Sequence, residues 1–192
     1  MIILGVDPGT LITGFGLIEI ERGAYSVLAY DVVKNSSDRS MPVRLKNIYD
    51  RLCEVILEYH PDEFAIETAF FGKNVQSALK IGHARGVSIL AAVNHQVPTT
   101  EYSPREVKKS VTGNGAASKQ QVQFMVKSQL MLEKVPKYFD ATDALAVALC
   151  HSFRMRNTKK KSARRGEKPV SKSLKGWANY IHTHPERVMK NK

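Results

Sequence analysis

The 192-residue sequence has only two cysteines, no long apolar run and no histidine spacing that demands a metal ion. Cys53 and Cys150 each lie in an apolar helical pattern, which predicts buried free thiols in a reducing compartment and no disulfide. No run of about 18 apolar residues is present, so no transmembrane helix is expected. Residues 1–6 lack a basic leader and are expected to form a strand rather than a signal peptide. We therefore expect a cytoplasmic protein.

Acidic residues are scarce only near the C-terminus. Residues 154–192 hold 13 of the 29 Lys and Arg but two of the 18 acids, which leaves 16 of each sign in residues 1–153. The net charge of +11 therefore belongs to the C-terminal segment and indicates affinity for a polyanion there. From residue 157 the sequence is polar and of low complexity, which predicts a disordered basic tail over residues 157–192 after a domain of residues 1–156.

Strand and helix patterns alternate along the first 153 residues. Three strands joined by tight turns are expected first, and the second of them has one slip in its alternation, between Leu17 and Ile18. Helices then alternate with two further strands. The expected strands are residues 1–6, 13–21, 25–33, 64–67 and 97–102. Four helices are expected to begin at residues 42, 74, 104 and 118, and a last helix is expected over about residues 140–153. This order predicts an α/β fold with a mixed five-stranded sheet and helices on both faces.

Four carboxylates are expected at one edge of this sheet. Asp7 and Glu67 each end an apolar strand, while Asp140 and Asp143 are three residues apart on one face of the last helix. If the two strands are parallel neighbours, their ends share one crevice. Carboxylates gathered there repel one another unless a cation neutralises them. Oxygen ligands without His or Cys suit Mg²⁺ or Mn²⁺, and two such ions can promote in-line hydrolysis of a phosphodiester.

Each acid also has a simpler interpretation. Asp7 can belong to a turn that ends a strand, and Glu67 can be a surface residue at a strand end. Asp140 can be an N-cap, with Asp143 complementing the helix dipole. Only the joint placement of all four residues favours a metal site.

Three acidic segments resemble those of the RuvC family of Holliday-junction resolvases, and two further stretches do so as well. In chain order the five segments are Gly5–Thr10, Phe64–Glu67, Lys73–Val87, Val107–Lys119 and Asp140–Ala146. The resemblance implies a ribonuclease-H-like fold and metal ligation by Asp7, Glu67, Asp140 and Asp143. It also implies two Mg²⁺ ions, for which Mn²⁺ can substitute, and symmetric nicking of four-way junctions to 5′-phosphate ends in recombination and repair. The basic tail is longer than the family's short ends, and its role stays open between DNA affinity, partner docking and none.

The same resemblance assigns basic residues beside the acids. Lys108 and Lys119 match the family's basic positions and are expected to take part in catalysis. Ser118 opens a helix whose free N–H groups, together with Lys119, suit a backbone phosphate, and Lys109 is a further candidate for DNA contact. The alternative for these lysines is a solvated helix face.

Two adjacent aromatics follow Glu67. Phe70 and Phe71 are expected to bind DNA by base stacking, with Phe70 the better match and the choice between them open. Lys73 is expected to contact DNA beside them. A hydrophobic staple onto the next helix is the alternative for the aromatics.

Small residues form a stripe along the helix expected over residues 74–93. Its middle holds Ala78, Gly82 and Gly86, and two glycines inside a helix suggest close approach by another backbone. That backbone belongs either to the protein's own sheet or to a second copy across a two-fold axis. The resemblance favours the homodimer. It also implies the RuvA–RuvB branch-migration complex as a partner and a nucleoid-associated location.

Three other functions compete with junction cleavage. An RNA-directed nuclease of the same fold is one, because the acids do not identify the sugar. Sugar-kinase and actin-like ATPases share the Asp-x-Gly-Thr turn, but they need two such domains and a second phosphate loop, for which 192 residues are too few. The third is a DNA-binding module that acts through the tail, for which the four acids would be dispensable.

Overall fold

The computed structural model describes residues 1–68 and 75–165, with side chains up to Arg156. The chain divides into two compact units, Met1–Met155 and Arg156–Lys192. The first unit contains the sheet and most of the helical residues. No helix in these described ranges is long and apolar enough to cross a membrane. Within the same ranges both cysteines are free thiols, Cys150 buried and Cys53 half-buried.

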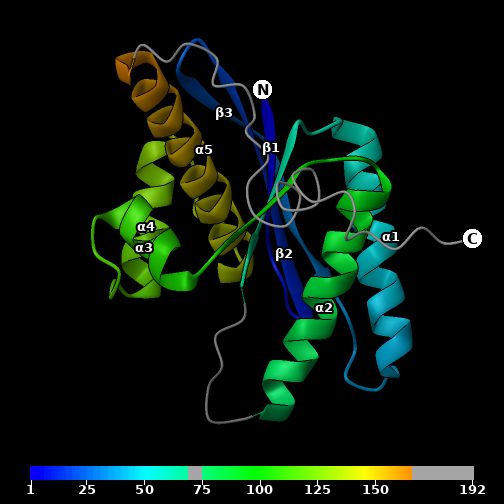
Figure 1. Ribbon diagram of the computed structural model, residues 1–192. Coiled ribbons are helices and arrows are strands. Elements are labelled where there is room, and N and C mark those ends of the chain that lie inside the picture. The colour runs from blue at the N-terminus through cyan, green and yellow to red at the C-terminus, as the bar shows by residue number, and fades with distance from the viewer. Residues whose placement is uncertain (69–74, 166–192) are drawn as a thin grey trace, which may run out of the picture. The chain divides into compact units, whose positions relative to one another are not determined.

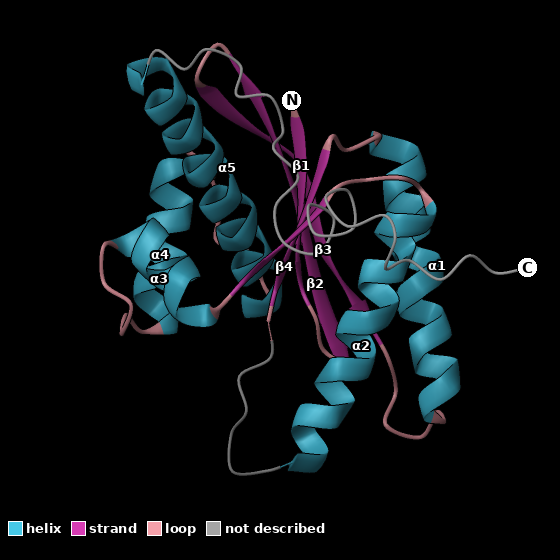
Figure 2. Cartoon of the chain, in the orientation of Figure 1, coloured by secondary structure: helices cyan, strands magenta, loops and turns pink. Residues whose placement is uncertain are grey.

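A mixed sheet of five strands forms the centre of the first unit (Figure 2). Its strands are β1 (Ile2–Asp7), β2 (Ile12–Glu21), β3 (Ala24–Lys34), β4 (Glu63–Glu67) and β5 (Thr99–Tyr102). The spatial order is β3-β2-β1-β4-β5. The hairpin strands β1, β2 and β3 pair antiparallel, whereas β4 and β5 run parallel to β1 because a helix precedes each of them. The predicted mixed sheet is confirmed.

Helices cover both faces of this sheet, as Figure 1 shows. They are α1 (Met41–Tyr59), α2 (Val75–Asn94), α3 (Pro104–Thr112), α4 (Lys119–Gln129) and α5 (Phe139–Arg165). One buried core joins the sheet to α1 and α2, and a second joins it to α3, α4 and α5. The central strand therefore contributes to both cores, with Leu4 and Val6 on the α1–α2 side and Ile3 on the other.

The slip in the second strand's alternation has a structural cause. Strand β2 is buried on both faces, so Leu17 packs in the α1–α2 core while Ile18 packs in the α5 core. The register with β3 also shifts between these two residues, because a bulge inserts one extra residue on the β3 side.

Local signals set most helix ends. Ser103 and Ser118 begin α3 and α4 with capping boxes, and Ser118 is the N-cap that the sequence predicts. The end of α5 is different: the helix continues past the expected end near Phe153 to Arg165. The added residues include Arg, Lys, Met and Ala, which favour helix, and no Gly or Pro interrupts them before Gly166.

Candidate active site

Strand pairing places Asp7 beside Glu67. Strands β1 and β4 are parallel neighbours, with Val6 opposite Ile66, so the two acids follow at the same carboxyl edge. Side chains alternate along a strand, and Ala65 packs in the α5 core whereas Ile66 packs in the opposite core. The same alternation directs Asp7 and Glu67 toward α5.

Glycines let α5 approach the sheet closely enough to bring its acids to that edge. A Cβ at Gly14 would lie 1.9 Å from the backbone oxygen of Asp140, and one at Gly5 would lie 2.1 Å from that of Ala144. Gly14 pairs with Asp7 across β1 and β2. The first turn of α5 therefore rests directly on the strands that carry the site.

The gathered carboxyl groups oppose one another's ionisation. Burial raises the pKa of Asp7 to about 7, and the charges of Asp143 and Asp140 contribute to the rise, while Lys119 opposes it. Burial likewise raises the pKa of Glu67 to about 8, with added contributions from Asp7 and Asp143. The pKa of Asp143 is also raised, chiefly by burial. The site thus holds excess negative charge that an additional cation would relieve.

Two lysines supply part of the opposing charge. Lys119 Nζ lies 3.3 Å from Asp143 Oδ2. The charge of this ammonium partly offsets the rise in the pKa values of Asp7, Glu67 and Asp143. Burial alone would lower the pKa of Lys119. The charge of Asp143 and its hydrogen bond to Lys119 outweigh that effect, so the pKa of Lys119 is raised. The charge of Lys108 likewise offsets part of the rise in the pKa values of Glu67 and Asp143. The structure thus brings both lysines together with the four acids.

The donor set fits a hard divalent cation. It offers carboxylate oxygens without thiolate or imidazole, and two of its acids resist ionisation in the absence of a cation. Among residues 1–68 and 75–156, however, no three His, Cys, Asp or Glu side chains are arranged as a ready-made metal site. Binding of a cation would therefore require these carboxylates to move closer together.

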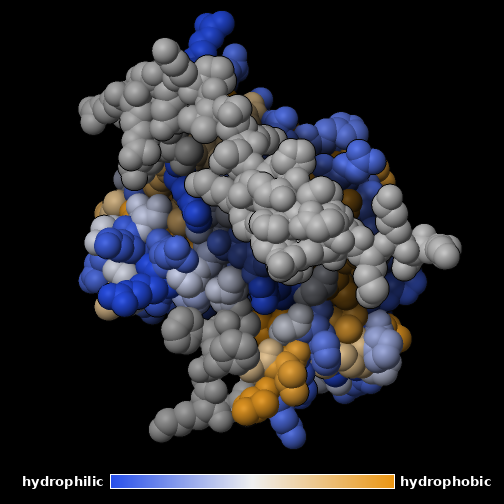
Figure 3. Space-filling view, viewed as in Figure 1, coloured by the Kyte–Doolittle hydropathy of each residue, from blue (hydrophilic) through white to orange (hydrophobic). Residues whose placement is uncertain are grey.

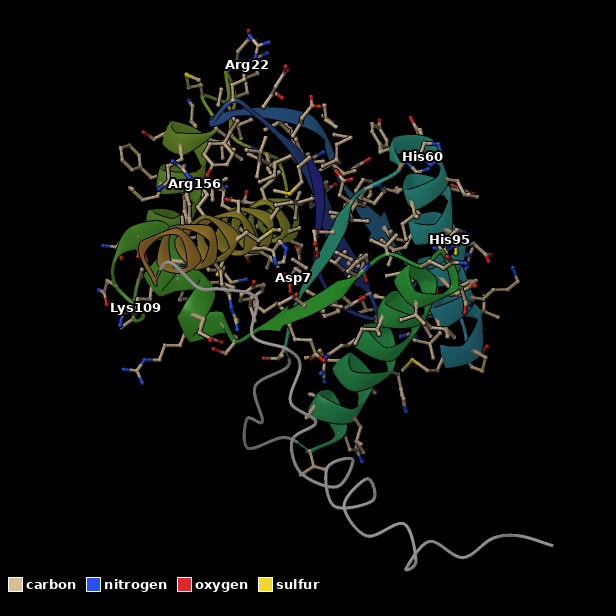
Figure 4. The ribbon with its side chains drawn as sticks, turned by 45° about the horizontal axis from the view of Figure 1, so that its top comes forward. Asp7, Arg22, His60, His95, Lys109 and Arg156 are labelled. Carbon is tan, nitrogen blue, oxygen red and sulfur yellow. The ribbon has the colours of Figure 1, made fainter. Side chains whose placement is uncertain are left out.

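The other predicted site residues have different positions. Lys109 is exposed on α3 and lies away from Asp7, on the outer side of the helix (Figure 4). The Ser118 hydroxyl accepts a hydrogen bond from the Gln121 N–H as the N-cap of α4, which leaves its hydrogen to donate elsewhere. Phe70, Phe71 and Lys73 lie outside the described residues, and their DNA contacts stay predictions.

Two supporting features were not predicted from the sequence. The Thr13 hydroxyl is buried and donates a 2.6 Å hydrogen bond to the Gly9 carbonyl, which ties the turn after Asp7 to β2. Gly5, Gly14 and Gly16 all face α5, and the alternation of glycine in the second strand was the available signal.

Comparisons with known proteins identify the family. A family model described as Crossover junction endodeoxyribonuclease RuvC matches residues 3–151, a span that holds all four acids and both lysines. The chain belongs to the RuvC family. RuvC of Christiangramia forsetii is 46% identical over 187 residues, covering 97% of this chain and 92% of the relative. RuvC of Desulforamulus reducens is 49% identical over 152 residues, covering 79% of this chain and 93% of the relative.

Solved structures agree with this assignment. Thermus thermophilus RuvC in complex with Holliday junction substrate matches with a TM-score of 0.77 and 34% identity, covering 82% of this chain and 96% of that one. The yeast mitochondrial Holliday junction resolvase Ydc2 matches with a TM-score of 0.57 at 9% identity, covering 85% of each chain, and shares the fold. The predicted ribonuclease-H-like fold is confirmed.

Proposed function

We propose that the protein is a Holliday-junction resolvase, an endonuclease that nicks two opposed strands of a four-way DNA junction. Its RuvC relatives are named crossover junction endodeoxyribonucleases, and the T. thermophilus protein is seen with a Holliday junction substrate. The observation that carries the proposal is the meeting of Asp7, Glu67 and the start of α5 at one sheet edge, with two lysines beside them.

The reaction is hydrolysis of one phosphodiester bond in each subunit. The oxygen of a water bonds to phosphorus, the bond from phosphorus to the 3′ oxygen breaks, and that oxygen gains a proton. The products are a 5′-phosphate and a 3′-hydroxyl, which a ligase can rejoin. Lys119 and Lys108 stand where their ammonium groups would balance the charge of the phosphoryl oxygens as the bond breaks.

We assign Asp7, Glu67, Asp140 and Asp143 as the residues that would hold Mg²⁺, as two ions for which Mn²⁺ can substitute. Bound there, the cations would activate a water and stabilise the departing oxygen. Asp7 and Glu67 have pKa values of about 7 and 8, so their carboxyl groups would give up protons as the site fills.

The exposed face of α2 supports a homodimer. Four apolar side chains on this helix are about half exposed or more: Val75 (69%), Leu79 (59%), Leu90 (49%) and Val93 (55%). Between them, added Cβ atoms at Gly82 and Gly86 would meet no atom within 4 Å, so the glycines face open space rather than the sheet. Figure 3 shows hydrophobic residues gathered over this helix. A two-fold contact here would orient two active sites oppositely, as two opposed cuts require.

Two further expectations follow from the family. We propose the RuvA–RuvB branch-migration complex as a partner, because a resolvase has to act on the junctions that such a complex moves. We also propose that the protein acts at the nucleoid, where its DNA substrate is.

Substrate selectivity tests the proposed function. Labelled four-way junction, linear duplex of the same sequence and an RNA–DNA hybrid are each incubated with the protein in Mg²⁺ or EDTA. We expect paired nicks in opposed strands of the junction alone, only with Mg²⁺, and sealing of the nicks by ligase. Cleavage of the hybrid without the junction would indicate the RNA-directed alternative, and binding without cleavage would indicate a DNA-binding module.

A further inference from the structure

Two lysines and a tyrosine cluster next to Asp140 and take no part in the chemistry above. Lys34 ends β3, while Lys137 and Tyr138 directly precede α5, whose first turn contains Asp140. Lys34 Nζ donates a 2.5 Å hydrogen bond to the Tyr138 hydroxyl and lies 4.1 Å from the centroid of its ring. Lys137 Nζ lies 5.6 Å from the same centroid. Both lysines are exposed and Tyr138 is half-buried.

Strand register places this cluster at the active-site edge of the sheet. Lys34 pairs with Ile12 at the start of β2, and Gly14, two residues further along β2, pairs with Asp7. Lys34 is thus two strands across and two residues along from Asp7, a backbone separation of about 12 Å. Lys108 lies on α3, which follows the other outer strand, β5. Basic side chains therefore flank the carboxylates toward both outer strands.

The positive charge of the cluster is not neutralised within the described part of the protein. No carboxylate in residues 1–68 or 75–156 lies within 4.0 Å of Lys34 Nζ or Lys137 Nζ. Two ammonium groups held around one ring repel each other, and an anion between them would relieve that repulsion. The hydrogen bond to the Tyr138 hydroxyl holds the Lys34 ammonium in place beside the ring.

We propose that Lys34, Lys137 and Tyr138 bind a backbone phosphate of the DNA strand that is cut, on the β3 side of the scissile bond. The assignment rests on the proposed nuclease function. The two ammonium groups contact the phosphate, and the Tyr138 hydroxyl fixes Lys34. At about 3.4 Å of axial rise per nucleotide, a separation of about 12 Å places this phosphate within about four nucleotides of the cut. Contacts of this kind set the register of the DNA on the protein and carry no base specificity.

The test measures junction binding by Lys34→Gln/Lys137→Gln at several salt concentrations in EDTA. Removing one phosphate contact should reduce the slope of log affinity against log salt by about 0.9. If the plots of log affinity against log salt for the wild type and the variant meet near 1 M salt, the variant binds about eightfold more weakly at 0.1 M salt. Lys134→Gln is the matched control, because Lys134 is an exposed lysine of the same loop that lines a hollow beside the middle of β3. Its slope should equal that of the wild type.

Neutral methylphosphonates, placed one at a time within about four nucleotides of the cut, locate the contact. At one position the substitution should weaken binding by the wild type but cause no further loss in the double variant. An unchanged slope, or equal losses in both proteins at every position, would overturn the proposal.

Wild-type cleavage of the unmodified junction is measured alongside. Failure of the proposed nuclease is then seen as absent cleavage, whereas failure of this contact leaves cleavage intact and the variants indistinguishable from wild type in binding. If the double variant shows reduced thermal stability, the salt series and the methylphosphonate scan are repeated with Lys137→Gln alone.

Discussion

Asp7 and Glu67 are acids whose ionisation opposes folding in the absence of a cation. Their pKa values of about 7 and 8 lie above the ordinary values of 3.8 and 4.5. A raised carboxyl pKa favours the folded state at low pH, and this contribution is lost as pH rises from the unfolded to the folded pKa. For Asp7 that window runs from about pH 4 to about pH 7. The same charge that would hold a metal therefore weakens the metal-free protein.

Asp7→Asn should stabilise the metal-free protein, because an amide cannot ionise. We expect a gain on the order of 1–2 kcal/mol at pH 8, a rise of a few degrees in Tm, and a smaller gain at pH 5. Thermal unfolding in EDTA at both pH values measures it. Added Mg²⁺ should raise the Tm of the wild type more than that of the variant. An Asp7→Asn protein that is less stable than wild type at pH 8 would contradict this electrostatic account.

Lys119 should matter for cleavage more than for binding. Lys119→Met removes the ammonium 3.3 Å from Asp143, so the pKa values of Asp7, Glu67 and Asp143 should rise further. We expect single-turnover cleavage to fall about 10²-fold at pH 7, with a smaller loss at pH 9. Lys127→Met, two turns further along α4, is the control and should cleave normally. An equal loss at both pH values would argue against an effect through the carboxylates.

At the residue scale, the sequence predicted that the four acids and both lysines would gather at one site, but it did not predict the cluster around Tyr138. Asp7, Glu67, Asp140 and Asp143 stand at strand and helix ends that periodicity locates. Lys34 and Tyr138 are 104 residues apart, and they meet because β3 pairs with β2 and the start of α5 rests on β2. No local spacing encodes that contact.

At the scale of elements, close packing of α5 on glycines positions half of the site. The strands and helices could be told apart because their hydrophobic periods differ. The prediction that Asp7 and Glu67 share one edge required β1 and β4 to be parallel neighbours, and they are. The small distance between α5 and the sheet was not predicted, because the alternating glycines of β2 can indicate a bulge or a bend as well as close approach by another backbone. The length of α5 was underestimated because its apolar periodicity ends near Phe153 while its helix propensity continues.

Gly14→Ala should therefore disturb both stability and cleavage. The new methyl group would lie 1.9 Å from the Asp140 backbone oxygen, so the strand or the helix has to move. We expect a loss of about 1–3 kcal/mol in the free energy of unfolding and reduced cleavage as Asp140 shifts. Denaturant unfolding and the junction assay measure the two effects. Glu21→Ala, at the exposed end of the same strand, should change neither, and a fully stable, active Gly14→Ala would exclude this packing role.

The exposed face of α2 gives a second test at this scale. Leu79→Glu should convert the proposed dimer to a monomer and abolish paired cutting, because a charge would be buried at the proposed two-fold contact. Leu57→Glu on α1 is the matched control, since both leucines are 59% exposed. Sedimentation analysis gives the oligomeric state. A Leu79→Glu dimer with wild-type affinity would place the interface elsewhere.

At the scale of the whole molecule, charge is divided between a neutral domain and a basic C-terminal segment. Removing residues 158–192 should leave cleavage at saturating protein unchanged, because the carboxylates and lysines of the site all lie before residue 158. The salt slope of junction binding should fall by about 0.9 for each DNA phosphate that the shortened protein no longer neutralises. Filter binding across a salt series measures it. An unchanged slope would remove DNA from the functions of the tail and leave partner docking to be tested.

We propose that the four gathered carboxylates perform metal-dependent junction cleavage. The most direct measurement follows binding and cleavage of one labelled four-way junction in the same samples, for wild type, Asp7→Asn and Glu67→Gln, with Mg²⁺ or EDTA. We predict that all three proteins bind the junction and that only the wild type with Mg²⁺ makes paired nicks. Metal-dependent cleavage by either variant at the wild-type rate would contradict the claim and reduce these acids to structural roles.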